Sequence, residues 1–257
     1  MKHRFLSIVG GLLTLAAAAA MDDAPPKPVR IVLVGDSTVT DFAGWGLGFK
    51  AFLTDRAVYC DAARSGRSSR SYRDEGHWAK ALAMRGDYYL IQFGHNDQPG
   101  KGPKLETDPD TTFTANMARY VDEVRAIGGR PILVTSLTRR NFDHQHPGKI
   151  NSTLGPYVEA VKRLATAKQV PLIDLHARSI ELCERLGPVE CDALNPLDEK
   201  GLVDHTHLDA NGSVVFARLV VEELRKVAPE LTPCLRSEPG PVTPPANSLR
   251  SRHPAGP

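Results

Sequence analysis

Five short runs of apolar and β-branched residues occur along the chain, and segments with helical spacing of apolar residues lie between most of them. Such runs are typical of strands that are buried on both faces, whereas apolar residues three or four positions apart predict amphipathic helices. We therefore expect strands at 29–34, 58–62, 88–93, 131–135 and 170–175. Helices are expected at 47–53, 72–84, 113–127, 157–167 and 213–227.

The alternation of strands and helices predicts the fold class. Parallel strands need crossover connections, and the helices of these connections cover both faces of the sheet. We expect a three-layer α/β/α fold of the doubly wound, flavodoxin-like type, with about five parallel strands in the order 2-1-3-4-5. A Gly pair before Pro131 indicates the end of one helix, and the segment Asp209 to Ser213 could cap the last one, since its Asn and Ser side chains can accept bonds from free amides.

The composition suits one sizeable α/β core rather than two domains, since the chain has 257 residues, of which 41% are hydrophobic and 24% charged. We expect the folded domain at 28–232. Beyond about residue 237 the apolar periodicity gives way to Pro, Ser, Arg and Gly. Residues 237–257 are therefore expected to form a disordered Pro-rich tail.

The first twenty residues have a basic start, an apolar stretch and a run of small residues that ends at Ala20. This order is typical of a secretory signal peptide, and the apolar part is short for a membrane span. We expect a secreted or periplasmic protein with no membrane contact after cleavage; a retained N-terminal anchor helix is the alternative. Loss of Lys2 and Arg4 leaves 30 basic and 30 acidic residues, which gives no support to binding of nucleic acid or another polyanion.

Export would place four cysteines in a compartment that permits disulfides. Cys183 and Cys191 are eight residues apart and would close a small loop. Cys60 with Cys234 would then tie the end of the fold to its sheet. Buried free thiols are the alternative, and no CxxC spacing indicates a metal site.

Polar residues stand where the first and third predicted strands end. In a doubly wound sheet, ligands bind beyond the carboxyl ends of the strands where the strand order reverses, which here is between these two strands. The first strand runs into Gly35, Asp36, Ser37 and Thr38, without the glycine pattern of a dinucleotide site. A serine hydroxyl at such a turn, with its own amide near a helix start, can be a nucleophile and part of an anion-stabilising pocket.

A serine nucleophile needs a base, and the segment DHTHLDANG supplies the best candidate. Asp204 and His207 are three positions apart, so one turn lets the carboxylate reach the far ring nitrogen of the imidazole, while His205 would point away. Two alternatives stay open. One is a solvated cluster at a helix start, and the other is a metal site of His205, His207 and Asp209, which no further ligand cluster accompanies.

Four segments, GDS, SGRSSRS, GHND and DHTH, follow one another in the order seen in the SGNH (GDSL-type) esterase family, which this chain resembles over roughly residues 30–227. The family is named for a Ser, a Gly, an Asn and a His in four sequence blocks. These match Ser37, Gly66, Asn96 and His207.

The resemblance implies a role for each matched residue. Ser37 is expected to be the nucleophile, His207 the base and Asp204 its orienting partner. The amides of Ser37 and Gly66, with the side-chain amide of Asn96, are expected to form the oxyanion hole. The implied mechanism requires no metal and no cofactor.

The finer wording of the blocks, GDSTV, GWG, GRSSRSYRDEG, QFGHND and SLTRRNF, resembles the rhamnogalacturonan acetylesterase branch of that family. The resemblance implies a substrate that is an acetylated pectic polysaccharide or oligosaccharide, and we expect the chain to act as a monomer. An acetyl group supplies little binding energy, so selectivity must come from the sugar side. Guanidinium groups near the strand tips could pair with uronate carboxylates. The candidate substrate-binding residues are Asp36, Arg67, Arg70, Arg140 and His144.

Structural roles would also account for several of these side chains. Some of the arginines could form ion pairs with Asp74, Glu75 or Asp143, and Trp45 and Tyr72 could stack on a sugar or pack in the core. The alternative functions are a xylan acetylesterase or short-chain lipase of the same fold, and a non-catalytic carbohydrate-binding protein. The intact catalytic set disfavours the binding protein, since binding needs no base beside a hydroxyl.

Overall fold

The computed structural model describes residues 27–242, and its centre is one sheet of five parallel strands. The strands follow the order β2-β1-β3-β4-β5, which confirms the prediction. The order reverses between β1 and β3, so the carboxyl ends of these two strands are the expected ligand-binding edge. The strands are β1 (Val29–Gly35), β2 (Ala57–Asp61), β3 (Tyr88–Gln92), β4 (Arg130–Val134) and β5 (Leu172–Ile173).

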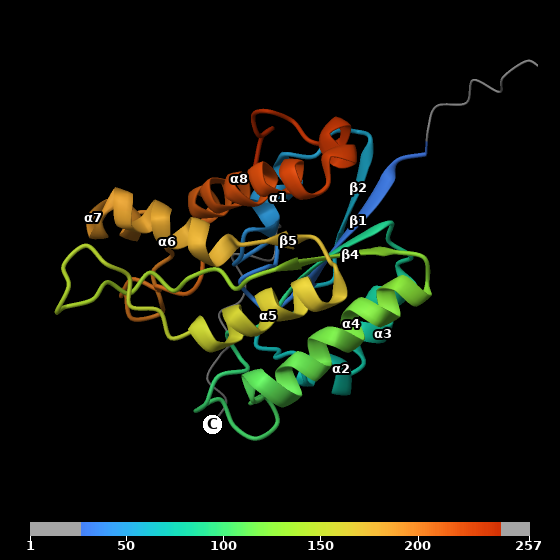
Figure 1. The fold of residues 1–257 in the computed structure, drawn as a ribbon. Coiled ribbons are helices and arrows are strands. Elements are labelled where there is room, and N and C mark those ends of the chain that lie inside the picture. Colours follow the sequence, from blue (N-terminus) through green and yellow to red (C-terminus); the bar gives the residue numbers. More distant parts are fainter. Residues whose placement is uncertain (1–26, 243–257) are drawn as a thin grey trace, which may run out of the picture.

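Helices cover both faces of the sheet, which gives the predicted three-layer arrangement (Figure 1). Ile31 and Leu33 of β1 face one helical layer, whereas Val32 and Val34 face the other, because successive side chains of a strand point to opposite faces. The layer over Ile31 contains α1 (Gly46–Ala51), α6 (Leu175–Leu186), α7 (Pro188–Asp192) and α8 (Ala210–Val227). The layer over Val32 contains α2 (Ser71–Asp74), α3 (His77–Ala83), α4 (Thr114–Ala126) and α5 (Gly155–Lys168).

Some elements differ from the predicted ones. The strand expected at 170–175 is reduced to β5, because the side chain of Asp174 accepts a hydrogen bond from the amide of Ala177 and caps α6. The helix expected at 72–84 is divided into α2 and α3 at Gly76, which has a φ of +76°. The expected helices do not include α6 and α7, although the buried residues Leu175, Leu182 and Cys183 of α6 have helical spacing. Two further short helices are η1 (Pro109–Phe113), a π-helix before α4, and η2 (Pro229–Cys234), a 3-10 helix after α8.

The N-terminal cap of α8 lies in the expected segment, but it is Asp209, so the expectation that the Asn and Ser side chains of this segment are the caps is wrong. The carboxylate of Asp209 accepts a hydrogen bond from the amide of Gly212 at 2.7 Å. The hydroxyl of Ser213 instead donates to the carbonyl of Gly44 and accepts from the amide of Gly48, at 2.6 and 2.9 Å. Ser213 thereby ties α8 to the start of α1.

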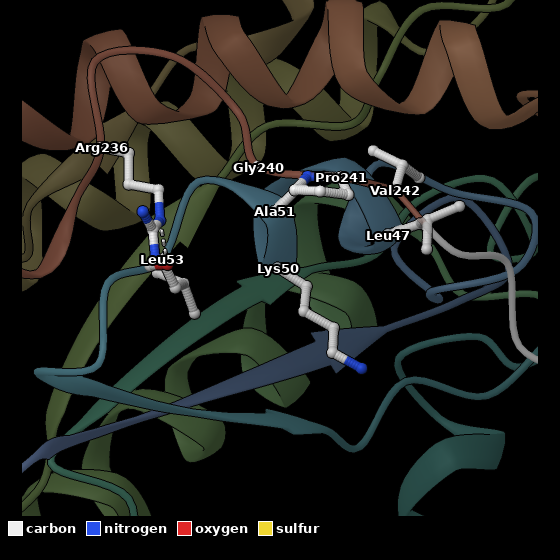
Figure 2. Close-up of a pocket in the computed structure, with 8 residues that line it drawn as sticks. All are labelled: Leu47, Lys50, Ala51, Leu53, Arg236, Gly240, Pro241 and Val242. Carbon is white, nitrogen blue, oxygen red and sulfur yellow. Dashed lines mark hydrogen bonds between the residues drawn. The ribbon is translucent and has the colours of Figure 1, made fainter.

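Residues 237–242 lie against α1 and α8, although their composition predicts disorder. The amide of Gly240 donates to the carbonyl of Ala51 at 2.8 Å, and Glu238 pairs with Arg218. A hollow of about 440 Å³ lies between this segment and α1, and none of the predicted catalytic residues lines it (Figure 2). The rest of the predicted tail and the predicted signal peptide lie outside the described residues. Among the residues described, no helix is both long and apolar enough for a membrane span.

All four cysteines are free thiols in the structure. Cys60 packs against the layer over Val32, whereas Cys234 lies in the core on the opposite face of the sheet. The predicted pairing of Cys60 with Cys234 is therefore wrong, because the sheet separates the two side chains. Cys183 and Cys191 are buried neighbours on α6 and α7, and the contact with Cys191 raises the pKa of Cys183. Their pairing in an exported protein stays a prediction.

Candidate active site

A turn after β1 presents a serine at the edge of the sheet. A Cβ on Gly35, the last residue of the strand, would lie 2.6 Å from the carbonyl oxygen of Gln92 on β3, so glycine is what allows this close approach. The next residue, Asp36, is fully buried, and its Oδ1 accepts hydrogen bonds from the amide and the hydroxyl of Thr38 at 2.9 and 2.7 Å. This turn leaves Ser37 only 8% exposed.

Buried hydrogen bonds hold the turn from inside the fold. Gln92 donates from Nε2 to the hydroxyl of Thr38 at 2.7 Å, and Trp45 donates from Nε1 to Oε1 of Gln92 at 3.0 Å. All three side chains are fully buried, so breaking any of these bonds would leave a polar atom without a partner. Trp45 is therefore a core residue and does not contact a sugar.

His207 lies in the loop before α8, and it faces the serine. Its Nε2 lies 2.9 Å from Oγ of Ser37, and its Nδ1 lies 2.6 Å from Oδ2 of Asp204. The loop is positioned by the amide of Leu208, which donates to the carbonyl of Ala43 in the turn that follows the serine. The structure therefore brings together the three residues that the sequence singles out for a nucleophile, a base and an orienting carboxylate.

Asp204 is fastened by its own loop as well as by the imidazole. Its Oδ1 accepts from the amides of Thr206 and His207 at 2.8 and 3.1 Å. Partial burial acts to raise the pKa of Asp204, but the hydrogen bonds from the His207 ring and the Thr206 amide outweigh it and hold this pKa well below its usual range. The carboxylate is thus ionised at neutral pH and favours the tautomer of His207 that carries its proton on Nδ1.

His205 is directed to a different partner. Its Nε2 lies 3.1 Å from Oδ1 of Asp192, at the end of α7. Asp209 caps α8, so the three residues considered as metal ligands contact three separate groups. Within residues 27–242, no group of three or more His, Cys, Asp or Glu side chains could hold a metal ion.

The loops after β2 and β3 meet beside the end of β1. The amide of Arg64 donates to the carbonyl of Gly35 at 2.9 Å, which places the start of the β2 loop next to the serine turn. Gly66 in this loop has a φ of +73°, a conformation that glycine adopts without strain. Asn96 follows β3 and donates from Nδ2 to the carbonyl of Arg67 at 3.1 Å. The structure thus brings Asn96 against the loop that contains Gly66.

Asp97 fastens these two loops to each other. Its Oδ1 accepts from the amide and the hydroxyl of Ser69 at 3.0 and 2.6 Å, and from the hydroxyl of Thr107 at 2.7 Å. Burial raises the pKa of Asp97 to about 6, although these hydrogen bonds act to lower it. The neighbouring Asn96 is consequently held in a defined position relative to the β2 loop.

A comparison with protein families shows which family has this arrangement of residues. The GDSL-like Lipase/Acylhydrolase family matches residues 33–214, well over half of the chain. The chain belongs to this family. The matched region contains all four block residues, from the serine turn to the His207 loop, and a member of this family is a carboxylic ester hydrolase.

This GDSL-like hydrolase is similar to two relatives and one solved structure that are acetylesterases by name. The rhamnogalacturonan acetylesterase RhgT of Bacillus subtilis is 37% identical over 232 residues, which cover 83% of this chain and 97% of RhgT. The rhamnogalacturonan acetylesterase of Emericella nidulans is 30% identical over 215 residues, which cover 73% of this chain and 81% of that relative. The structure of Axe2, an acetylxylan esterase from Geobacillus stearothermophilus, matches with a TM-score of 0.56 over 77% of this chain and 94% of Axe2. At 18% identity, the likeness to Axe2 shows the shared fold.

Two of the five predicted substrate-binding residues of this GDSL-like hydrolase are fully buried. Oδ1 of Asp36 accepts the hydrogen bond from the amide of Thr38 within the serine turn. Its Oδ2 lies 3.6 Å from Nδ1 of the buried His95. Arg140 donates to the carbonyl of His207 from inside the fold. The prediction that Asp36 and Arg140 contact a polysaccharide is wrong, because neither side chain reaches the surface.

The other three predicted binding residues lie at or near the surface. Arg67 is 39% exposed and pairs with Glu75 at 2.8 Å, the ion pair that the sequence suggested as an alternative. Arg70 donates to the carbonyl of Pro103 at 2.9 Å, and His144 is exposed in the long connection between β4 and α5. Their contact with a substrate stays a prediction.

The sequence pattern does not single out four polar residues that shape the site: Thr38, Gln92, Asp97 and Asn195. One signal was available for Gln92, since a polar residue at the end of an otherwise apolar strand needs a buried partner. A signal was also available for Asp97, because it stands next to Asn96 in the GHND block that follows the third strand. No comparable signal marks Asn195, whose partner Arg140 is 55 positions away.

Proposed function

We propose that this GDSL-like hydrolase is an exported serine acetylesterase that removes acetyl groups from a pectic polysaccharide of the rhamnogalacturonan type. The observation that carries the proposal is the chain of contacts from Asp204 through His207 to Ser37 at the tip of β1. The acetylesterases RhgT and that of Emericella nidulans, which match most of this chain, support the choice of acyl group and of polysaccharide.

The first half of the reaction acylates the serine. Nε2 of His207 accepts the hydroxyl proton of Ser37 while Oγ bonds to the acetyl carbonyl carbon. Asp204 stabilises the imidazolium that forms, because its carboxylate lies 2.6 Å from Nδ1. The bond from the carbonyl carbon to the sugar oxygen then breaks, and His207 passes its proton to that oxygen. The products of this half are a free sugar hydroxyl and an acetylated Ser37.

The second half restores the enzyme with one water molecule. His207 accepts a proton from the water as the water oxygen bonds to the acetyl carbon. The bond to Oγ of Ser37 breaks, His207 returns the proton to Oγ, and acetic acid leaves and ionises to acetate in solution. No other co-reactant is needed to balance either half.

Negative charge on the former carbonyl oxygen develops in both halves and needs donors that are already in place. We assign this role to the amides of Ser37 and Gly66 and to Nδ2 of Asn96. A neutral side-chain amide suits the role because it donates hydrogen bonds and does not compete with His207 as a base. The bond from Asn96 to the Arg67 carbonyl uses one of its two amide hydrogens and leaves the second for the oxyanion.

Selectivity for a pectic chain is assigned to basic side chains around the site. Arg67 and Arg70 belong to the loop that contains Gly66, and His144 is exposed in the connection after β4. A uronate carboxylate would compete with Glu75 for the guanidinium of Arg67, which makes its contribution dependent on ionic strength. Export follows from the leader pattern of residues 1–20, and the mature N-terminus of the secreted protein tests it.

Acetate release from purified polysaccharides tests the proposal. Wild-type protein and Ser37→Ala are incubated with acetylated rhamnogalacturonan, acetylated homogalacturonan and acetylated xylan, and with p-nitrophenyl acetate as a general ester. We expect turnover of p-nitrophenyl acetate and fastest acetate release from rhamnogalacturonan, and no turnover by the folded Ser37→Ala protein. Faster release from xylan would assign a different ester hydrolase of the same fold, and binding without any turnover would assign a carbohydrate-binding protein.

A further inference from the structure

We infer that Arg140 is a positioning residue that holds His207 at the distance from Ser37 that proton transfer requires. The inference rests on the proposed function. Arg140 lies in the connection after β4 and is fully buried, so it acts on the reaction only through the groups that it contacts.

Residue 140 binds the loop that carries the base at two points. Its backbone amide donates to the carbonyl of His205 at 2.9 Å, and Nη2 of its side chain donates to the carbonyl of His207 at 2.6 Å. This loop has no regular secondary structure, so its carbonyl groups need partners from elsewhere in the fold. Arg140 satisfies two of them, one of which belongs to the proposed base itself.

The guanidinium group is fixed in turn by the surrounding fold. Nε donates to Oδ1 of Asn195 at 2.5 Å, and Nη1 donates to the carbonyl of Thr138 at 3.1 Å. The ring of Phe216, on α8, lies 5.7 Å from Cζ. A planar group with three of its donors engaged in different directions leaves the carbonyl of His207 little freedom to move.

The charge of Arg140 is unusual for so buried a position. All its side-chain hydrogen bonds go to neutral oxygens, and a buried cation without a paired carboxylate is costly compared with an apolar side chain of similar size. Burial lowers the pKa of Arg140 to about 10, against the attraction of Asp204 and Asp192, and the group stays charged at neutral pH. Stability alone therefore does not account for an arginine here, whereas anchoring of the His207 loop does.

A positioning role and a purely structural role predict different kinetics. Loss of a structural residue lowers the melting temperature and the folded fraction but leaves kcat of the folded enzyme unchanged. Loss of a positioning residue lowers kcat with little change in KM, because substrate binding in the ground state does not use His207. A displacement of about 1 Å in a catalytic group costs on the order of a hundredfold in rate.

The test compares Arg140→Met and Arg140→Lys with the wild type, using p-nitrophenyl acetate. The matched control is Arg225→Met, which removes a half-buried guanidinium that also binds two backbone carbonyls, those of Leu235 and Arg236, far from the His207 loop. We expect kcat to fall on the order of a hundredfold in Arg140→Met and about tenfold in Arg140→Lys, with KM nearly unchanged in both. Arg225→Met is expected to lower the melting temperature and to keep the wild-type kcat.

A second readout does not depend on activity. The proton shared between Nδ1 of His207 and Asp204 is expected to give a far-downfield NMR resonance, which shifts or disappears in the Arg140 variants and stays in Arg225→Met. An inactive wild type would refute the proposed function, and the resonance would then decide the inference separately. If Arg140→Met does not fold, Arg140→Lys decides: a wild-type kcat and an unchanged resonance in a folded Arg140 variant would overturn the inference.

Discussion

The imidazole of His207 lies 2.9 Å from the hydroxyl of Ser37, although 170 positions separate the two residues in the chain. His205, two positions earlier, contacts Asp192 instead. The DHTH segment therefore contains two histidines with the same chemistry and different surroundings, and only one of them is in reach of the serine.

This difference predicts unequal effects of two alanine substitutions. His207→Ala is expected to lower kcat by at least roughly a thousandfold, because no other described group contacts the serine hydroxyl as a base. His205→Ala is expected to change kcat only slightly. Steady-state kinetics with p-nitrophenyl acetate checks both, with circular dichroism as the control for folding. A similar loss in the two variants would contradict the assignment of His207 as the base.

The oxyanion assignment predicts a loss in kcat at Asn96. Asn96→Ala is expected to lower kcat roughly a hundredfold to a thousandfold at nearly constant KM, since the missing donor serves the transition state rather than the bound substrate. The matched control is Asn116→Ala, which removes an amide that donates to Ser69 in the same loop. Kinetics of the two variants on the same ester provide the measurement. Equal kcat values for Asn96→Ala and the wild type would remove Asn96 from the oxyanion hole.

Asp97 predicts a specific dependence of stability on pH. Burial raises its pKa from the ordinary value of 3.8 to about 6 in the folded protein, so the folded state binds this proton more tightly than the unfolded state. The resulting stabilisation is fully present below about pH 4 and is lost as the pH rises through 6.

Urea unfolding of the wild type and of Asp97→Asn between pH 4 and pH 7 measures this contribution. The free energy of unfolding of the wild type is expected to decrease relative to that of the variant over this range. A difference between the two proteins that stays constant with pH would show that Asp97 titrates at its ordinary value.

The cysteine arrangement makes a prediction that rests on the proposed export of the protein. Cys183 and Cys191 are neighbours, whereas the sheet separates Cys60 from Cys234. In secreted protein that is denatured without reduction, we expect a thiol reagent to label Cys60 and Cys234 and to leave Cys183 and Cys191 unlabelled. Mass spectrometry of tryptic peptides checks this, with reduced protein as the fully labelled control. Labelling of all four cysteines would show that oxidation does not join the neighbouring pair.

Much of the fold was readable from the residue pattern, because the information is local. Continuous apolar runs mark strands buried on both faces, and their alternation with helical segments leads to the observed parallel sheet and its strand order. The pattern of apolar residues does not predict the ends of elements where a single polar contact determines them. Asp174 ends β5 by capping α6, and Asp209 rather than Ser213 caps α8.

The residue types of the candidate site were also readable, because nucleophile, base and carboxylate must be particular side chains. The pattern of four blocks points to Ser37, Gly66, Asn96 and His207, and the spacing of three points to Asp204. The same spacing predicts the contact of Asp204 with His207, which the structure shows. The contacts of Asn96 and Arg140 with other loops were not predicted, since they depend on which loops meet at the edge of the sheet.

Arg140 shows what the sequence alone could not predict. In the sequence it is one of several arginines after strand ends, and an exposed role in binding uronate was a reasonable interpretation. Only the folding of α6, α7 and α8 over one face of the sheet surrounds it with Asn195, Phe216 and the His207 loop. Burial is a property of the packed whole, because the residues that exclude water from a side chain come from distant parts of the chain. The sequence by itself therefore determines which chemical groups are present, and tertiary packing determines which partner each charged group contacts.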